Sequence, residues 1–169
     1  MQTLRLLRMA SAVVTIALLS LPLSAADLTG THNDWKTYRH GSGRELMCFA
    51  VSAAQEQQPS GSSRQTPHVY VTAWPKQGVK AEVSVLLGFD VKSDSDITID
   101  VGGSSFKLFA DGDRAFVGDS GDEERLLAAM RRGLKMTIEA TSAKGVSSKD
   151  VFSLSGVTAS VQAITAGCS

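Results

Sequence analysis

The sequence predicts a mainly β protein, an antiparallel β-sandwich of immunoglobulin-like architecture with two short helices. Short apolar or alternating stretches recur along most of the chain, and turns rich in Gly, Asp and Pro separate them. Apolar residues at helical spacing are confined to two segments, residues 120–133 and 157–165. Many short strands with few helices are typical of antiparallel sheets that enclose a single core.

The predicted strands are of two kinds. Residues 46–51 read LMCFAV, a continuous apolar run typical of a buried strand, whereas residues 68–74 alternate before Pro75 ends the strand. The pair Gly102 and Gly103 is suited to a tight hairpin. In chain order, strands are expected at residues 34–38, 46–51, 68–74, 79–91, 97–101, 104–110, 114–118, 134–143 and 151–156.

Two polar segments predict connections rather than sites. Residues 55–66, QEQQPSGSSRQT, indicate a solvated loop, although a functional loop is the alternative. Asp111 and Asp113 flank Gly112, which suggests either a turn or a calcium site. An EF-hand needs further oxygen ligands and a glutamate at its twelfth position, and these are missing from the sequence. We therefore expect a turn.

The first predicted helix, residues 120–133, carries signals at both ends. Ser120 and Glu123 match a capping box, and Gly133 is expected at the C′ position. Arg131 and Arg132 lie at the negative end of the helix dipole, which explains this basic pair without a binding role. The side chains expected to face the core are Leu126, Leu127 and Met130.

The two cysteines, Cys48 and Cys168, are expected to form a disulfide if the protein is exported. A closing helix over residues 157–165 would carry the chain to Cys168, and the bridge would hold that helix on the core. A loop of this length stabilises a fold by about 4 to 5 kcal/mol in the chain-entropy model. Metal or redox chemistry is the alternative, but the sequence has no CxxC motif and its histidines lack ligand spacing. A dimer linked through Cys168 is a further alternative.

The N-terminal residues 1–26 have the pattern of a secretory signal peptide. Two arginines precede an apolar run over residues 9–21, and small residues end at Ala26. A transmembrane anchor is the alternative, but this run is shorter than the about 20 residues that span a bilayer. We expect cleavage after Ala26, which leaves residues 27–169 as one β-sandwich domain in the periplasm, at the cell surface or in the medium.

The balance of charged residues argues against a nucleic-acid partner. The chain has 17 Lys and Arg and 17 Asp and Glu, and loss of Arg5 and Arg8 leaves a net charge of about −2. Nucleic-acid binding through a basic face needs clustered cations, which the sequence lacks. We expect no nucleic-acid partner and no transmembrane segment after cleavage.

The sequence contains no catalytic constellation. There is no GxSxG nucleophile elbow and no GxxxxGKS or GxGxxG phosphate loop. Trp35 and Trp74 are either core aromatics or an exposed platform for a sugar or peptide. We expect a protein that is not an enzyme and has no cofactor.

A set of short motifs in a fixed order points to a family. An Ala-Met helix end and a Gly precede a Thr-Ser-Ala turn, and a Ser-Leu-x-Gly stretch then leads to the last cysteine. The matching residues are Ala129, Met130, Gly133, Thr141, Ser142, Ala143, Gly145, Ser153, Leu154, Gly156, Ala159 and Cys168. Upstream matches are Asp34-Trp35, 48–52, 70–72 with Pro75, 82–84, Gly88-Phe89, 106–109 and 112–115. Together these residues resemble the invasion-associated locus B family of exported bacterial proteins, over nearly all of residues 27–169.

This resemblance implies an exported β-rich protein without an established enzymatic activity, in a family associated with host-cell invasion. The family turn has Arg where this chain has Lys144, and Lys lacks the planar bidentate donor that Arg offers to a carboxylate. We expect a monomer that binds an envelope or host protein and serves invasion or envelope maintenance. The alternative is a periplasmic module that binds a small ligand or glycan. Trp35, Trp74 and Lys144 are the candidate interaction residues.

Overall fold

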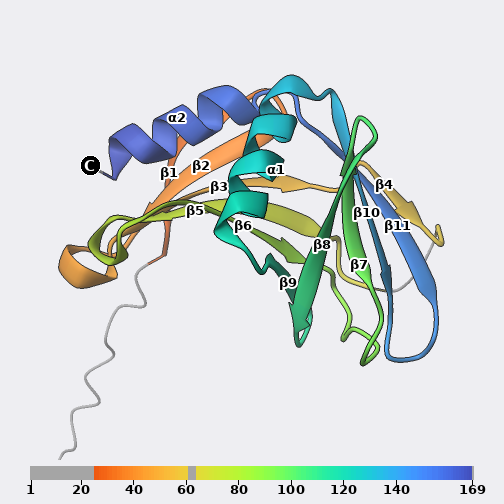
Figure 1. The fold of residues 1–169 in the computed structure, drawn as a ribbon. Helices are drawn as coiled ribbons and strands as arrows, with labels where there is room; N and C mark the ends of the chain where they lie inside the picture. Colours follow the sequence, from red (N-terminus) through yellow and green to blue (C-terminus); the bar gives the residue numbers. More distant parts are fainter. Residues whose placement is uncertain (1–24, 61–63, 169) are drawn as a thin grey trace, which may run out of the picture.

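The computed structural model describes residues 25–60 and 64–168 of the 169-residue chain (Figure 1). Within these residues the strands are β1 (Asp27–His32), β2 (Trp35–His40), β3 (Met47–Ala53), β4 (Glu56–Gln58), β5 (His68–Trp74), β6 (Val79–Leu86), β7 (Ile97–Val101), β8 (Ser104–Asp111), β9 (Arg114–Val117), β10 (Lys135–Thr141) and β11 (Ser147–Ser153). The helices are α1 (Ser120–Arg132) and α2 (Val157–Gly167), with 3-10 turns η1 (Gly43–Glu45) and η2 (Pro75–Gln77). The predicted signal peptide falls mostly on residues 1–24, which lie outside the described residues.

The strands form one antiparallel sheet in the order β1-β2-β3-β5-β6-β9-β8-β7-β10-β11-β4. The predicted mainly β class, antiparallel pairing and two helices are confirmed. A single sheet replaces two separate ones: the strands β7, β8, β10 and β11 run steeply across the direction of β1, β2, β3, β5 and β6 (Figure 1). Strand β9 joins the two parts by pairing with β6 and β8, and the Trp35 indole Nε1 of β2 also donates to the Ser153 carbonyl oxygen of β11 at 3.0 Å.

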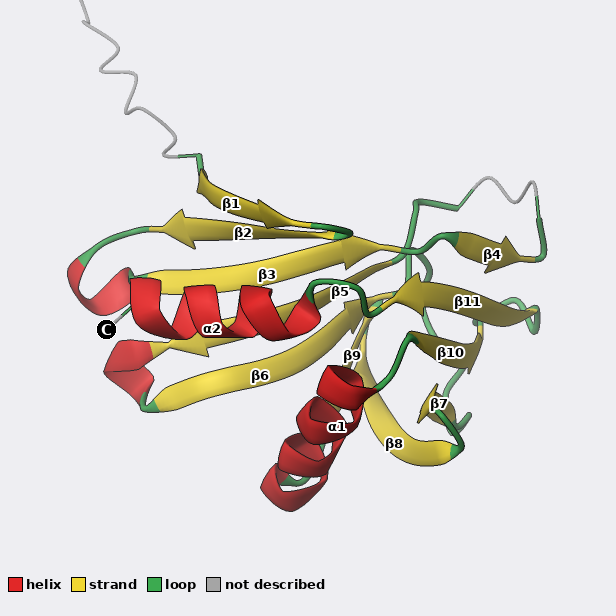
Figure 2. Cartoon of the chain, turned by 90° about the horizontal axis from the view of Figure 1, so that it is seen from above, coloured by secondary structure: helices red, strands yellow, loops and turns green. Residues whose placement is uncertain are grey.

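Both helices lie on the same side of the sheet, which we call the inner face (Figure 2). Alternate residues of each strand point to this face, and their apolar side chains form one core cluster with those of the helices. The largest fully buried side chains of this core are Trp35, Leu87, Ile97, Ile99, Leu126, Met130, Met136, Ile138, Phe152 and Ile164. The opposite side, the outer face, has no helix over it among the described residues.

The strand predictions fail where polar sequence joins a sheet edge. Strands β1 and β4 are both edge strands, and β4 lies inside the predicted loop of residues 55–66, where Gln58 pairs with Lys149 of β11. The strand predicted over residues 79–91 ends at Leu86. Gly88 follows with a φ of 75°, and a Cβ there would lie 2.5 Å from the Gln65 carbonyl oxygen, so the chain turns tightly against a neighbouring loop.

The predicted capping box of α1 is wrong. Asp119, rather than Ser120, is the N-cap residue, and its carboxylate accepts hydrogen bonds from two backbone amides of the first turn at 2.9 and 3.1 Å. Glu123 instead accepts a hydrogen bond from the Val83 amide of β6. The carboxylate that was expected to complete the cap therefore joins the helix to the sheet.

The other end of α1 also differs from the prediction. Gly133 has an extended backbone, with φ −79° and ψ 163°, rather than the left-handed C′ conformation. A Cβ at this position would lie 2.6 Å from Val101 Cγ1 and 2.9 Å from Leu154 Cδ1. The glycine therefore permits close packing at the point where the chain enters β10. The predicted burial of the helix stripe is confirmed for Leu126, Leu127 and Met130.

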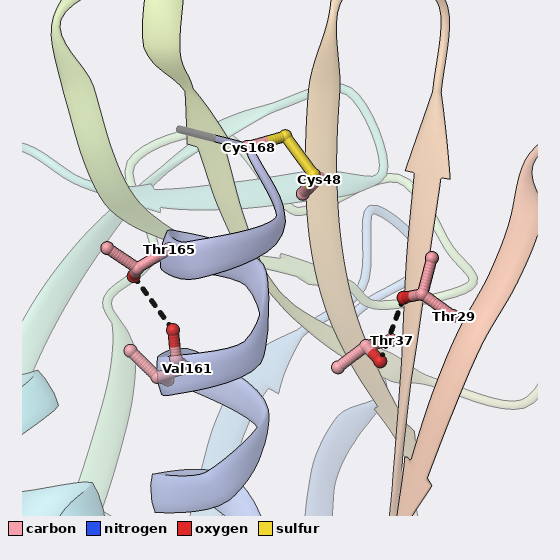
Figure 3. Close-up of a disulfide and its surroundings, with 6 residues drawn as sticks. All are labelled: Thr29, Thr37, Cys48, Val161, Thr165 and Cys168. Atoms are coloured by element: carbon pink, nitrogen blue, oxygen red, sulfur yellow. Dashed lines mark hydrogen bonds between the residues drawn. A yellow bond between two sulfur atoms is a disulfide. The ribbon is translucent and has the colours of Figure 1, made fainter.

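Helix α2 closes the inner face at the end of the chain. It packs on β1, β2, β3 and β5, and its side chains Val157, Val161 and Ile164 are buried as the helical spacing predicts. The disulfide joins Cys168, just beyond the helix, to Cys48 of β3 with a Cα to Cα distance of 5.8 Å (Figure 3). Both cysteines are buried, so the bridge is part of the core.

No helix in residues 25–60 and 64–168 is long and apolar enough to cross a membrane.

Candidate interaction surface

Aromatic side chains follow one another across the outer face. Tyr38 of β2 lies directly opposite Phe49 of β3, and their rings stack with centroids 5.1 Å apart and planes 14° from parallel. Phe49 also meets Tyr70 of β5 at 6.1 Å in a tilted arrangement. Each ring is half-buried, because its sequence neighbours point inward and the ring itself points outward.

The same line of side chains continues beyond β6. Ser84 of β6 pairs with Tyr70 on one side and with Phe116 of β9 on the other. Phe116 then lies opposite Phe109 of β8, and these rings stack at 5.7 Å. At the other end, Leu28 of β1 lies opposite Tyr38. We call this set the outer aromatic row: Leu28, Tyr38, Phe49, Tyr70, Phe116 and Phe109.

The two ends of the outer aromatic row are its most exposed parts. Leu28 is 57% exposed and Phe109 is 52% exposed. Pairs of aromatic rings in such contact contribute about 0.5 to 1.5 kcal/mol beyond the area they bury. The contacts therefore hold the rings in fixed positions, in two groups that the buried Ser84 separates, while leaving part of their apolar surface in water. Apolar surface that is exposed in a patch marks interaction sites.

Cations border the outer aromatic row. The Arg114 guanidinium lies 5.6 Å from the centroid of the Tyr70 ring, a cation-π contact. Lys36 is exposed on β2, two residues from Tyr38 and therefore on the same face, opposite Val51. Among the described residues, neither Lys36 nor Arg114 forms an ion pair. Carboxylates lie on the same face, because Asp111 is directly opposite Arg114 and Glu82 is two residues from Ser84 on β6. The row thus combines apolar rings with charged groups of both signs.

The structure separates the three residues predicted for interaction. Trp35 is a correction: its side chain is fully buried against β11, so it offers no platform to a sugar or peptide. Trp74 is half-buried at the end of β5, before Pro75. Lys144 is exposed in the turn between β10 and β11, where it lines a cleft. The structure therefore does not bring these residues together into one site.

Sequence reasoning missed the outer aromatic row, although a signal for it is present. Phe49 stands between Cys48 and Ala50, and Tyr70 stands between Val69 and Val71. In both strands the small or β-branched neighbours are buried, and the aromatic residue takes the alternate, outward position. An aromatic residue at a solvent-facing strand position is the pattern that would have found these outward residues, although not their neighbours across the strands.

The fold and this surface define a small disulfide-linked β protein, closed by helices on one face and bearing an uncovered aromatic row on the other. The family model for the Invasion associated locus B (IalB) protein matches residues 39–165. The chain therefore belongs to the IalB family, which confirms the resemblance found in the sequence.

A solved structure has a similar fold. It is the crystal structure of invasion associated protein b from Bartonella henselae, at a TM-score of 0.57 and 14% sequence identity. The similarity covers 85% of this chain and 97% of that chain. At this identity the likeness concerns the fold alone. No curated protein matches the sequence.

Proposed function

We propose that this IalB family member is an exported, non-enzymatic protein that binds another protein of the bacterial envelope or of a host cell. The outer aromatic row is the observation that carries this proposal. The stacked rings on neighbouring strands, with the exposed side chains Leu28 and Phe109 at the two ends, offer apolar surface in a fixed geometry. Aromatic residues are enriched among the side chains that dominate binding energy at protein interfaces.

The border of the row defines the chemistry of the partner. Arg114 and Lys36 place positive charge beside the rings, and Asp111 and Glu82 place negative charge there, so the partner presents an apolar surface flanked by charged groups. Apolar contact supplies most of the affinity, whereas charge complementarity guides the encounter and the orientation. Binding should therefore weaken with ionic strength without being abolished.

Export and the lack of enzymatic activity are parts of the same proposal. The signal-peptide pattern of residues 1–26 and the disulfide both suit an oxidising compartment outside the cytoplasm. The IalB family is not known as an enzyme family. A role in invasion or in envelope maintenance follows from which partner the row binds.

Site-specific photocrosslinking in the living bacterium tests the proposal. A photoreactive phenylalanine analogue replaces Phe109 in the row, and a matched control replaces Leu134, which is 86% exposed and outside the row. We expect a discrete adduct from position 109 that is absent from position 134. Mass spectrometry then identifies the adduct, and binding is measured with the purified partner at two salt concentrations.

Three results would contradict the proposal. Equal adducts from positions 109 and 134 would show that crosslinking reflects exposure alone. The absence of any adduct from position 109, in bacteria alone and in contact with host cells, would remove the row as a binding surface. An adduct of twice the chain mass would reassign the outer face to self-association and overturn the expected monomer.

A further inference from the structure

A cleft of about 480 Å³ lies beside the turn that joins β10 and β11, and no residue of the outer aromatic row lines it. One wall is the turn itself, with Lys144 and Val146, and the other is the segment after β6, with Phe89 and Asp90. Arg64 also lines it. The volume is within the range of small-molecule sites, about 300 to 1,000 Å³.

Hydrogen bonds hold the two walls together. The Ala143 amide donates to the Asp90 carbonyl oxygen at 2.8 Å, and the Lys92 amide donates to the Thr141 carbonyl oxygen at 2.9 Å. Within the turn, the Val146 amide donates to the Ser142 hydroxyl oxygen at 3.1 Å. The cleft is therefore formed in advance, which lowers the entropic cost of binding a ligand.

Arg64 is fixed in place by several partners. Its guanidinium pairs with the buried carboxylate of Asp150, donates to the Leu87 carbonyl oxygen at 3.1 Å, and lies 5.3 Å from the centroid of the Phe89 ring. Burial raises the pKa of the Asp150 carboxyl, and the guanidinium opposes this rise. The ion pair leaves no net charge here. The Arg64 Nε is buried and has no hydrogen-bond partner among the described residues.

The remaining lining has two charges of opposite sign and an apolar surface. Lys144 and Asp90 are exposed, and neither forms an ion pair in the part of the chain that the structure describes. Val146 is 49% exposed, although it is apolar, and Phe89 is half-buried. A ligand that complements this lining carries a carboxylate, an ammonium group and an apolar side chain.

We infer that this cleft binds a small zwitterion with an apolar side chain, an amino acid or a short peptide. The carboxylate of the ligand pairs with Lys144 and its ammonium group pairs with Asp90. The apolar side chain lies against Val146 and Phe89. This site goes beyond the proposed protein interaction, because it has different residues and a different kind of ligand.

Amide NMR titration of protein recovered from exporting cells tests the inference, with L-phenylalanine as the probe. N-acetyl-L-phenylalanine lacks the ammonium group, and L-phenylalaninamide lacks the carboxylate. We expect saturable shifts in residues 88–92 and 142–146 with L-phenylalanine. Each derivative should have a dissociation constant about two- to fivefold higher than that of L-phenylalanine, because an exposed ion pair contributes about that factor to affinity.

Variants assign each charge to its partner. Lys144→Gln should weaken L-phenylalanine binding about two- to fivefold but leave the affinity for L-phenylalaninamide unchanged, because that ligand has no carboxylate. Asp90→Asn should also weaken L-phenylalanine binding about two- to fivefold but leave the affinity for N-acetyl-L-phenylalanine unchanged. Val146→Ser should weaken all three ligands. The matched control is Lys76→Gln, an exposed lysine in η2 that does not line the cleft.

The inference would be overturned by the absence of saturable shifts in these segments, or by equal effects of Lys144→Gln and Lys76→Gln. Tighter binding of the acetyl derivative than of L-phenylalanine would also overturn it, because the ammonium group would then have no partner. A failure here leaves the outer aromatic row as proposed, since none of its residues lines the cleft.

Discussion

The two faces of the sheet use the same strands in opposite ways. On the inner face, α1 and α2 cover the alternate side chains, and the disulfide fixes the second helix to β3. On the outer face, the aromatic row has comparably large side chains but no cover among the described residues. The inner face therefore serves stability, and the outer face has apolar surface that stability does not require.

The contrast follows from the alternation of a strand. Successive side chains point to opposite faces, so the buried Val69 and Val71 force Tyr70 outward. Exposed aromatic surface lowers the solubility of a protein. Where such surface is present in a folded protein, it commonly marks contact with a partner. Changes on the inner face should alter unfolding, whereas changes on the outer face should alter binding.

The largest effect is expected from two matched phenylalanines. Phe152 of β11 is fully buried, and Phe109 of β8 is 52% exposed. Phe152→Ala should lower the free energy of unfolding by about 3 to 5 kcal/mol because it leaves a cavity in the core. Phe109→Ala should lower it by only about 0.5 to 1.5 kcal/mol, because it mainly loses the stacked contact with Phe116. Urea denaturation of both variants checks the pair, and equal losses would break the distinction between the faces.

Loss of the disulfide comes next. Cys168→Ala should lower the free energy of unfolding by about 2 to 5 kcal/mol, because the open chain gains conformational freedom when unfolded. Thermal unfolding of the wild type with and without reductant provides the control, and reduction should give a similar loss. An unchanged stability in both experiments would show that α2 stays on the inner face without the bridge.

Close packing under α1 gives a smaller effect. Gly133→Ala should cost about 1 to 3 kcal/mol, since the added Cβ would overlap Val101 and Leu154. Gly167 is the matched control, because a Cβ there meets no atom within 4 Å and Ala suits a helix better. If both variants were equally stable in chemical denaturation, the inner face would be less tightly packed than the structure indicates.

The smallest effect concerns Glu123, which joins α1 to β6. Burial raises its pKa, the hydrogen bond from the Val83 amide lowers it, and the charge of Glu82 raises it, with a net rise. The folded protein therefore holds this proton to a higher pH than the unfolded chain, and stability falls as the pH increases through that interval. Glu123→Gln keeps an acceptor for the Val83 amide but cannot ionise.

The free energy of unfolding of Glu123→Gln should therefore increase relative to that of the wild type as the pH rises from below the ordinary Glu pKa to neutrality. Thermal unfolding at several pH values measures the difference. A difference that shrinks with increasing pH would mean that the ionised carboxylate is favoured at this contact, as the positive end of the α1 dipole would promote.

Much of the inner face could be predicted from the sequence, because burial leaves a periodic pattern. The helix α2 and the strand β3 were found from Val161 and Cys48 with their apolar neighbours. The edge strands β1 and β4 leave no such pattern in the sequence, because their residues are mostly polar. They form strands because a neighbouring strand offers free backbone groups to pair with. The sequence alone does not decide between core and surface for Trp35, since its burial depends on β11, over a hundred positions away in the chain.

Features that depend on register could not be predicted. The outer aromatic row needs the pairings of Tyr38 with Phe49 and of Phe116 with Phe109, which hydrogen bonds between strands determine. The Arg64 contact with Asp150 joins residues 86 positions apart. The family turn points to Lys144, but the cleft beside this residue forms only because the segment after β6 lies next to that turn.

The binding role of the outer aromatic row is tested most directly by the affinity of matched surface variants for the partner captured at position 109. Phe109→Ala should raise the dissociation constant about tenfold or more, as loss of an aromatic anchor does, without a change in fold. Leu134→Ala, which removes a more exposed side chain outside the row, should change it less than about twofold. Equal dissociation constants for the two variants would contradict the account.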